Sequence, residues 1–533
     1  MASPLASPTA ASTPRAKRLG KAVKYGETDP ISCELPADED EQRTQRLLQE
    51  LGVVFPAETP EEMAAKQEAL RQVQSLFSEW ADCLVKVTPV GSFRLGVSTS
   101  SSDVDVLCAA PPGINRQDFF TVFAEKLTDH EGVSECVPIP TAFTPVIKIK
   151  MNSIEMDLLF AQLTRPLEED DDLAEVLKDD AMLVGMAEQC VRSVNALRVA
   201  TKILELVPNQ TTFQQTLRFI KHWARRRGLY CNSLGFLGGI SWSILVARVC
   251  QLYPYFAPSQ LVLRFFRLYQ QWNWEKVVTL CEVIDPKTIN GLEHLSAWDA
   301  DQTYAVMPVL TPAVPAMNST HNTTDTSKRI LLEEFARGYK LLQKGESERI
   351  WEELADEFPF FTSCDAYVQV VVLGTTVDSF AKVAGLFESK LRLLVMNLEP
   401  IPGMLLHPSH QRHSVGTQLP EDYSFGCAFY IGLKFTTQVA RPHQYFDLNG
   451  AVQAFVQPLL RKLLESGTEP GTFMVKVKRV NAPQLQEQDG SVSPPEAQET
   501  RSASASVRRT RSTEDPDLLA KPEAQAAKRA RTA

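Results

Sequence analysis

Two aspartates, Asp103 and Asp105, stand one residue apart in the chain. If this run is a strand, their side chains share one face, while Val104 and Val106 point to the other face and into a core. Carboxylates so close together repel each other unless a cation lies between them. Mg²⁺ uses one or two carboxylates together with substrate phosphates. The pair therefore indicates phosphoryl or nucleotidyl transfer, although an isolated Asp-x-Asp is more often two solvent-facing acids on an edge strand.

A Gly-Ser step upstream favours the metal-site interpretation. Gly91 and Ser92 precede Asp103 with ten residues between Ser92 and Asp103. Glycine permits close approach of the backbone to a ligand. Ser92 can open a helix at Phe93, so that free N–H groups and its hydroxyl face a phosphate. The alternative is an ordinary helix-capping turn. A phosphate cradle combined with a carboxylate pair is rarer than either feature alone.

A third carboxylate, Asp157, lies in the second of two strand-like runs, 146–151 and 154–160. The Asn152-Ser153 step between them predicts a hairpin turn. Asp157 is flanked by apolar residues and is expected to be held rigidly, whereas Glu155 on the same face is expected to be a solvent or structural residue. Three carboxylates from neighbouring strands can bind two metal ions about 3.5–4 Å apart, an arrangement that suits in-line displacement at phosphorus.

The elements that must position these groups follow from hydrophobic periodicity and composition. Helices are expected over about 40–52, 60–80, 212–227, 239–250 and 375–395, and strands over 367–373 and 426–435. The chain is thus predicted to be an α+β multidomain protein. Its parts are a disordered basic arm (1–22), a mixed α/β region with N-terminal helices (23–200), a helical central region (201–350), a small α+β module (351–480) and a disordered tail (481–533).

Bulk composition narrows the function classes. The 533 residues carry a formal net charge of −10, which argues weakly against nucleic acid covering the whole surface but leaves room for a local basic channel. The ten cysteines are scattered without zinc-ligand spacing, as expected of reduced thiols in an intracellular protein. No apolar stretch reaches the roughly 18 residues of a membrane span, and no secretory signal is seen. We therefore expect no membrane association.

The spacing of Gly91-Ser92, Asp103-x-Asp105 and the later Asp157 resembles the signature of the DNA polymerase β-like nucleotidyltransferase superfamily. Within it, the chain closely resembles the eukaryotic nuclear poly(A) polymerases. The resemblance extends from about residue 25 to about residue 480. It is carried by the runs at 91–97, 102–105, 192–195, 206–209, 221–225, 230–242 and 307–312, and more weakly by 355–435.

This resemblance implies a nucleotidyltransferase catalytic domain with a mixed sheet, a helical middle domain and a ferredoxin-like or RRM-like RNA-binding domain. It implies that Asp103, Asp105 and Asp157 are catalytic and hold two Mg²⁺ ions, with Mn²⁺ as a possible substitute. Around ATP it implies, besides these aspartates, Val90, Gly91, Ser92, Thr99, Val104, Asn195, Lys221, Tyr230, Asn232, Gly239 and Ile240. Lys221 and Tyr230 would contact the triphosphate, Asn195 and Asn232 the sugar or base, and Gly239 and Ile240 the adenine.

The implied reaction is template-independent addition of AMP from ATP to the 3′ end of pre-mRNA, with release of pyrophosphate. The expected partners are ATP, an RNA 3′ end and cleavage/polyadenylation factors, for an enzyme that works as a monomer in the nucleus. Basic clusters at 15–18, 508–511 and 528–531 fit nuclear import signals or nonspecific nucleic-acid contacts. Two alternatives stay open: a uridylyltransferase or CCA-adding enzyme of the same superfamily, and an inactive RNA-binding scaffold that retains the fold.

Overall fold

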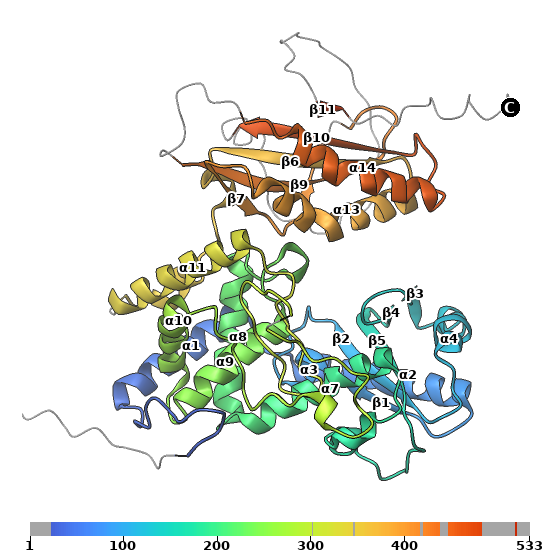
Figure 1. The fold of residues 1–533 in the computed structure, drawn as a ribbon, viewed down its shortest axis with the longest axis vertical. Coiled ribbons are helices and arrows are strands. Elements are labelled where there is room, and N and C mark those ends of the chain that lie inside the picture. Colours follow the sequence, from blue (N-terminus) through green and yellow to red (C-terminus); the bar gives the residue numbers. More distant parts are fainter. Residues whose placement is uncertain are drawn as a thin grey trace, which may run out of the picture.

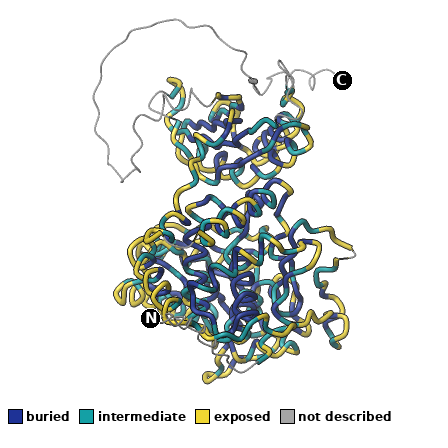
Figure 2. Tube along the Cα trace, turned by 90° about the vertical axis from the view of Figure 1, so that its left-hand side faces the viewer, coloured by how far each residue is buried: buried dark blue, intermediate teal, exposed yellow. Residues whose placement is uncertain are grey.

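The computed structural model describes residues 23–300, 302–344, 347–415, 419–436 and 446–481, together with the short strand β11 at Leu518–Leu519. The basic clusters of the arm and the tail lie outside the described residues. Figure 1 shows a large lower body, made by the first two thirds of the chain, and a smaller C-terminal body above it. Buried residues run through the centre of both bodies, while exposed residues line the outer turns (Figure 2).

The first sheet is mixed, as predicted, with strand order β1-β2-β5-β4-β3. Its strands are β1 (Lys86–Pro89), β2 (Val104–Ala110), β3 (Val133–Ile139), β4 (Val146–Met151) and β5 (Ile154–Gln162). Only β2 and β5 pair in parallel; the other neighbours are antiparallel. The predicted hairpin is confirmed: Asn152 and Ser153 form the β4–β5 turn with φ of 50° and 68°, as a tight hairpin turn requires.

Alternation along β2 and β5 divides the core between the two faces of this sheet. Val104, Val106 and Phe160 join the cluster under helix α2 (Pro60–Ala81), together with the aromatic residues of η1 (Phe119–Phe123). Leu107 and Leu159 instead join the cluster that includes helix α7 (Glu188–Leu206). By the period of two, Asp105 and Asp157 point to this second face.

The helical part of the lower body packs around one aromatic core. It contains α1 (Asp38–Val54), α8 (Gln210–Arg226), α9 (Gly239–Leu252), α10 (Pro258–Gln271), α11 (Asp325–Lys344) and α12 (Ile350–Leu354). Trp223 of α8 and Trp242 of α9 are fully buried and meet edge to face, 5.8 Å between ring centroids. Asn209 caps α8, because its Oδ1 accepts the Thr212 N–H at 2.9 Å. The predicted helices at 40–52, 60–80, 212–227 and 239–250 are confirmed to within a few residues.

Short helical turns complete the lower body. They are α3 (Gly91–Arg94), α4 (Arg116–Asp118), α5 (Ala124–Thr128), α6 (Leu173–Val176), η2 (Asp180–Leu183), η3 (Asn232–Leu234), η4 (Pro286–Thr288) and, at the start of the C-terminal body, η5 (Phe360–Thr362).

The C-terminal body has the βαββαβ order and the sheet order of a ferredoxin-like fold, so the predicted fold class is confirmed. Its elements are β6 (Ala366–Gly374), α13 (Val377–Leu398), β7 (Met404–Pro408), β9 (Phe425–Phe435), α14 (Asn449–Glu465) and β10 (Phe473–Asn481). The antiparallel order is β11-β10-β6-β9-β7, with β8 (His413–Ser414) paired to β9. Val368 and Val370 pack toward the helices, and Tyr367 toward the opposite face.

Candidate active site

The sheet places two of the predicted carboxylates opposite each other. Asp105 of β2 and Asp157 of β5 are partners in the parallel register. Asp103 stands in the turn just before β2 and is exposed. The expectation that Asp103 and Asp105 both lie within the strand is therefore wrong by one residue, because the turn closed by the Ser102 N–H and the Thr99 carbonyl runs up to Asp103.

The electrostatics of these carboxylates indicate a shortage of positive charge. Burial, with contributions from Asp103 and Asp157, raises the pKa of Asp105 to about 6, and the ammonium groups of Lys148 and Lys221 offset only part of this shift. Burial likewise raises the pKa of Asp157, against the opposing effect of Lys148. Carboxylates that resist ionisation because they are desolvated and close to other anions gain most from a bound cation.

Lys148 of β4 makes the closest contact to this group, although it was not among the predicted site residues. Its Nζ lies 2.6 Å from Asp157 Oδ2 and 2.9 Å from Oδ1. The signal was present, since pairing outward from the Asn152-Ser153 turn sets Lys148 opposite Asp157. Within the residues that the structure describes, no three His, Cys, Asp or Glu side chains converge into a ready-made metal cluster. At Asp157 an ammonium group stands where a cation would bind.

Gly91 is required by its contact with Asp105. Its φ is +57°, and a Cβ at this position would lie 2.1 Å from Asp105 Oδ2. The Val90 N–H donates to the Asp105 carbonyl at 2.8 Å, which ties the turn to the strand, and Val90 itself is fully buried. Helix α3 begins at Gly91 with Val90 preceding it. Ser92 is thus the second residue of this short helix and does not open it, contrary to the prediction.

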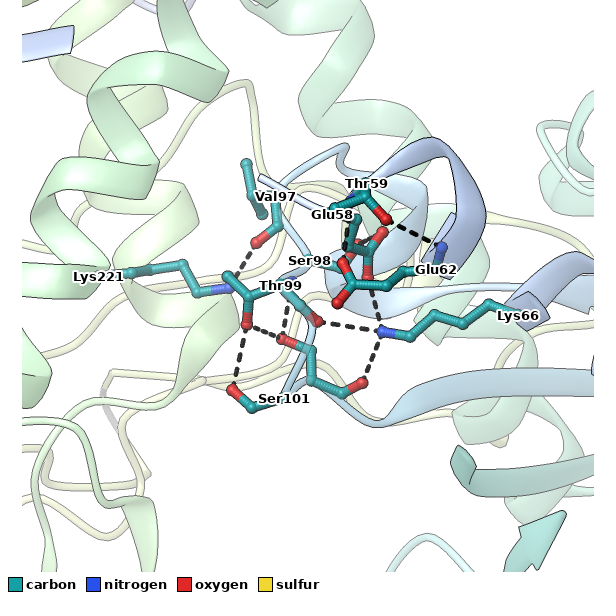
Figure 3. Close-up of polar contacts among 10 residues, drawn as sticks. Glu58, Thr59, Glu62, Lys66, Val97, Ser98, Thr99, Ser101 and Lys221 are labelled. Carbon is teal, nitrogen blue, oxygen red and sulfur yellow. Dashed lines mark hydrogen bonds and ion pairs between the residues drawn. The ribbon is translucent and has the colours of Figure 1, made fainter. Parts of the chain in front are cut away.

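Lys221 reaches the same region from helix α8 (Figure 3). Only 2% of the residue is exposed, and its Nζ donates to the Val97 carbonyl at 3.1 Å. Burial and the nearby Arg225 lower the pKa of Lys221 to about 8, while Asp103 and Asp105 act in the opposite direction. Thr99, also buried, follows in the same loop. The structure therefore brings Lys221 and the loop with Thr99 beside the aspartates.

Tyr230 and Gly239 form a second contact near the end of α8. A Cβ on Gly239 would lie 2.7 Å from the Tyr230 hydroxyl, so glycine permits this approach. The Arg225 guanidinium lies 5.0 Å from the centroid of the Tyr230 ring. Burial raises the pKa of the Tyr230 hydroxyl, which also interacts with Asp103 and Asp105. Ile240 is half-buried in the first turn of α9.

The two asparagines expected to contact the sugar or base differ in their surroundings. Asn195 lies on α7, and its Oδ1 accepts a hydrogen bond from Arg198 Nη1 at 2.8 Å. Asn232 is exposed in η3, next to Gly238. Arg198 was not predicted, although its spacing of three residues from Asn195 on one helix is a detectable signal.

Three family models match the chain in succession. They are the poly(A) polymerase nucleotidyltransferase domain over residues 26–207, the poly(A) polymerase central domain over 212–357 and the poly(A) polymerase predicted RNA binding domain over 359–417. The chain belongs to the poly(A) polymerase family. The resemblance seen in the motifs is thereby confirmed, including the type of each of the three folded parts.

Curated relatives agree with this assignment. The chain is 34% identical over 483 residues to a poly(A) polymerase of Dictyostelium discoideum, covering 86% of this chain and 58% of that protein. It is 35% identical over 456 residues to nuclear poly(A) polymerase 1 of Arabidopsis thaliana, covering 81% and 62%. The chain therefore spans about three fifths of the length of these relatives.

Solved structures of Cid1, described as an RNA terminal uridylyl transferase, align at 14% identity with a TM-score of 0.45, over 60% of this chain and 99% of that one. A likeness of this size carries no argument about the chemistry here. Among the described residues, no helix is both long and apolar enough to cross a membrane.

Proposed function

We propose that this protein is a template-independent polynucleotide adenylyltransferase that adds AMP from ATP to RNA 3′ ends. One observation carries the proposal. Asp105 and Asp157 face each other across parallel strands, with Asp103 beside them and a glycine against Asp105, in a chain whose successive parts match poly(A) polymerase domains. The relatives named nuclear support a nuclear enzyme acting in mRNA polyadenylation. The proposal also includes recruitment by cleavage/polyadenylation factors and action as a monomer.

Asp103, Asp105 and Asp157 are the proposed ligands of two Mg²⁺ ions, with Mn²⁺ as a substitute. The donor set fits, because hard cations prefer carboxylate oxygens. The raised pKa of Asp105 and the ammonium group already bound to Asp157 both indicate that this place attracts positive charge. When bound, the ions would activate the RNA 3′-hydroxyl and neutralise charge on the triphosphate.

The other residues would orient ATP and stabilise the departing charge. The 3′-oxygen forms a bond to the α-phosphorus, the bond from the α-phosphorus to the bridging oxygen breaks, pyrophosphate leaves, and the hydroxyl proton passes to solvent. Lys221, buried and close to the aspartates, is placed to bind the triphosphate as the charge moves onto it. The remaining proposed ATP contacts are Val90, Gly91, Ser92, Thr99, Val104, Asn195, Tyr230, Asn232, Gly239 and Ile240.

The proposed boundaries place catalysis in residues 23–200, the helical domain in 201–350 and the RNA-binding domain in 351–480. Lys221, Tyr230 and Gly239 belong to the second of these domains, whereas the aspartates belong to the first. The ATP site would therefore lie between two domains, which is a frequent place for a ligand site.

Extension of a labelled oligo(A) primer with Mg²⁺ and each of the four nucleoside triphosphates separately tests the function. We expect long products with ATP and little or no extension with UTP, CTP or GTP. A preference for UTP, or a short addition of defined length, would assign the chain to a sister group of the superfamily. Primer binding without extension by any nucleotide would indicate an inactive scaffold.

Lys148 gives a pH prediction. The ammonium of Lys148 lowers the pKa of both Asp157 and Asp105. In a Lys148→Met variant both carboxyls would hold their protons to higher pH, so the acid limb of the rate profile, measured at limiting Mg²⁺, should move to higher pH. Lys150→Met is the matched control, because Lys150 is on the same strand but pairs with Glu155 at 4.0 Å. An acid limb that stays in place in Lys148→Met would contradict this role.

A further inference from the structure

Lys66 of helix α2 is a buried lysine, and two of its three hydrogen bonds are directed at the loop before β2 (Figure 3). Only 4% of the residue is exposed. Its Nζ donates to Glu58 Oε1 at 2.6 Å, to the Thr99 carbonyl at 3.1 Å and to the Ser102 carbonyl at 2.8 Å. An ammonium group has three N–H donors, so these acceptors use all of them.

Glu58 attaches to the same loop through its second oxygen. Glu58 Oε2 accepts the Ser98 hydroxyl at 2.9 Å, and the side chain is as buried as that of Lys66. The position of Glu58 is fixed because it directly precedes a capping box: Thr59 Oγ1 accepts the Glu62 N–H at 3.2 Å, and Glu62 Oε2 accepts the Thr59 N–H at 2.9 Å. Glu58 thus stands directly before the capped start of α2, and Lys66 follows within the first two turns of the same helix.

The loop that these groups hold, residues 97–103, contains two proposed site residues. Thr99 is buried in its middle and Asp103 ends it. The Ser102 carbonyl bound by Lys66 belongs to the peptide group that leads into Asp103. From the other side, Lys221 binds the Val97 carbonyl. Two buried lysines therefore bind the loop: Lys221 of α8 at its first residue, and Lys66 of α2 at Thr99 and Ser102 (Figure 3).

Stability alone is a weak explanation for this arrangement. Removing two opposite charges from water is costly, and apolar residues of similar volume often stabilise a core at least as well as a buried ion pair does. The pair instead fixes the position of the loop. Three hydrogen bonds join Lys66 or Glu58 to Ser98, Thr99 and Ser102 of the loop, and a fourth joins Lys66 to Glu58.

We propose that Lys66, supported by Glu58, is a positioning residue that sets the 97–103 loop and thereby places Asp103 against Asp105. The catalytic part of this inference rests on the proposed function. A merely structural role would instead make Lys66 an anchor of α2, with no effect on the loop beyond loss of overall stability. The two roles predict different results when Lys66 and Glu58 are both replaced by uncharged residues.

The test compares wild type, Lys66→Met, Glu58→Gln and the Lys66→Met/Glu58→Gln double variant in the full chain. Lys126→Met is the matched control, since Lys126 also pairs with α2, through Glu79 at 3.0 Å, but on its exposed side. Three quantities are measured: the thermal unfolding midpoint, hydrogen exchange of peptides covering residues 97–103, and kcat and KM for ATP as functions of Mg²⁺ concentration.

Lys66→Met leaves the Glu58 carboxylate buried and unpaired, so it should lower the unfolding midpoint. The double variant should regain the wild-type midpoint but not the wild-type position of the loop. Hydrogen exchange over 97–103 should stay faster than in wild type, kcat should fall by about 10- to 100-fold, and a higher Mg²⁺ concentration should be needed for half-maximal activity. Glu58→Gln keeps the two carbonyl contacts and should show the same changes to a smaller degree. Lys126→Met should match wild type in exchange and kinetics.

Wild-type exchange over 97–103 in both the double variant and Glu58→Gln would overturn the inference, as would recovery of kcat together with the midpoint. If the wild-type chain adds no nucleotide, the proposed function fails, but the exchange measurement still decides whether Lys66 positions the loop. The two failures are therefore distinguishable.

Discussion

Asp105→Asn is expected to abolish nucleotide addition and at the same time to stabilise the fold at neutral pH. Loss of a ligand to the proposed metal ions should lower the rate by a factor on the order of 10³ or more. The stabilisation follows from the pKa of Asp105, which burial and the neighbouring Asp103 and Asp157 raise from 3.8 to about 6. Ionising such a group destabilises the folded state by up to about 3 kcal/mol.

The pH dependence has a definite sign. Below the pKa of the unfolded state, a carboxyl whose folded-state pKa is raised is neutral in both states and does not affect stability. The folded protein then loses stability as the pH rises through about 6, the folded-state pKa of Asp105. The advantage of Asp105→Asn should therefore be full at pH 7 to 8 and should shrink as the pH falls below 6. Thermal unfolding in metal-free buffer with a chelator measures it, and a midpoint a few degrees above wild type is expected.

Asp170→Asn is a suitable control, because Asp170 is exposed on a loop. It should change neither the rate nor the unfolding midpoint. An inactive Asp105→Asn variant that is clearly less stable than wild type would mean that the carboxylate has a structural role. Retained activity would remove Asp105 from the proposed metal site.

Gly91→Ala should inactivate the enzyme by a steric route. The added Cβ would lie 2.1 Å from Asp105 Oδ2, so either the turn or the carboxylate must move. Displacement of a catalytic group by about 1 Å typically costs about 100-fold in rate, and we expect a loss of kcat/KM of at least that size. Steady-state kinetics of primer extension, together with circular dichroism to check the fold, measure the effect.

Gly113→Ala separates this clash from backbone strain. Gly113 also has a positive φ, +104°, but nothing lies within 4 Å of the position its Cβ would take. Both variants should lose some stability, since L side chains disfavour such backbone angles. Only Gly91→Ala should lose activity. Equal kinetic losses in the two variants would show that strain, and not contact with Asp105, accounts for the effect.

Local periodicity was sufficient to predict much of this fold. Alternation in β2 and β5 correctly placed Val104 and Val106 in the core, and the Asn152-Ser153 step correctly marked a hairpin. These features depend on neighbours in the chain, which the sequence displays directly. For the same reason β6, α13 and β9 of the C-terminal body were predicted, whereas β7 and α14 were not.

The contacts that hold the site were not predictable in this way. Lys66 meets Thr99 and Ser102 across more than thirty residues, and nothing in its own surroundings in the sequence distinguishes it from a solvated helix lysine. The start of α3 at Gly91 depends on the hydrogen bond from Val90 to Asp105, which forms only in the folded sheet. Lys148 is the exception, because hairpin register alone places it opposite Asp157.

The decisive measurement for the proposed reaction is the amount of pyrophosphate released per nucleotide added. It would be measured with the full chain, oligo(A), ATP and Mg²⁺, in wild type and in Asp103→Ala, Asp105→Ala and Asp157→Ala. We expect one pyrophosphate for each AMP incorporated by wild type, and loss of both products in all three variants although they remain folded. ATP-dependent elongation that persists when any of the three aspartates is replaced would contradict it.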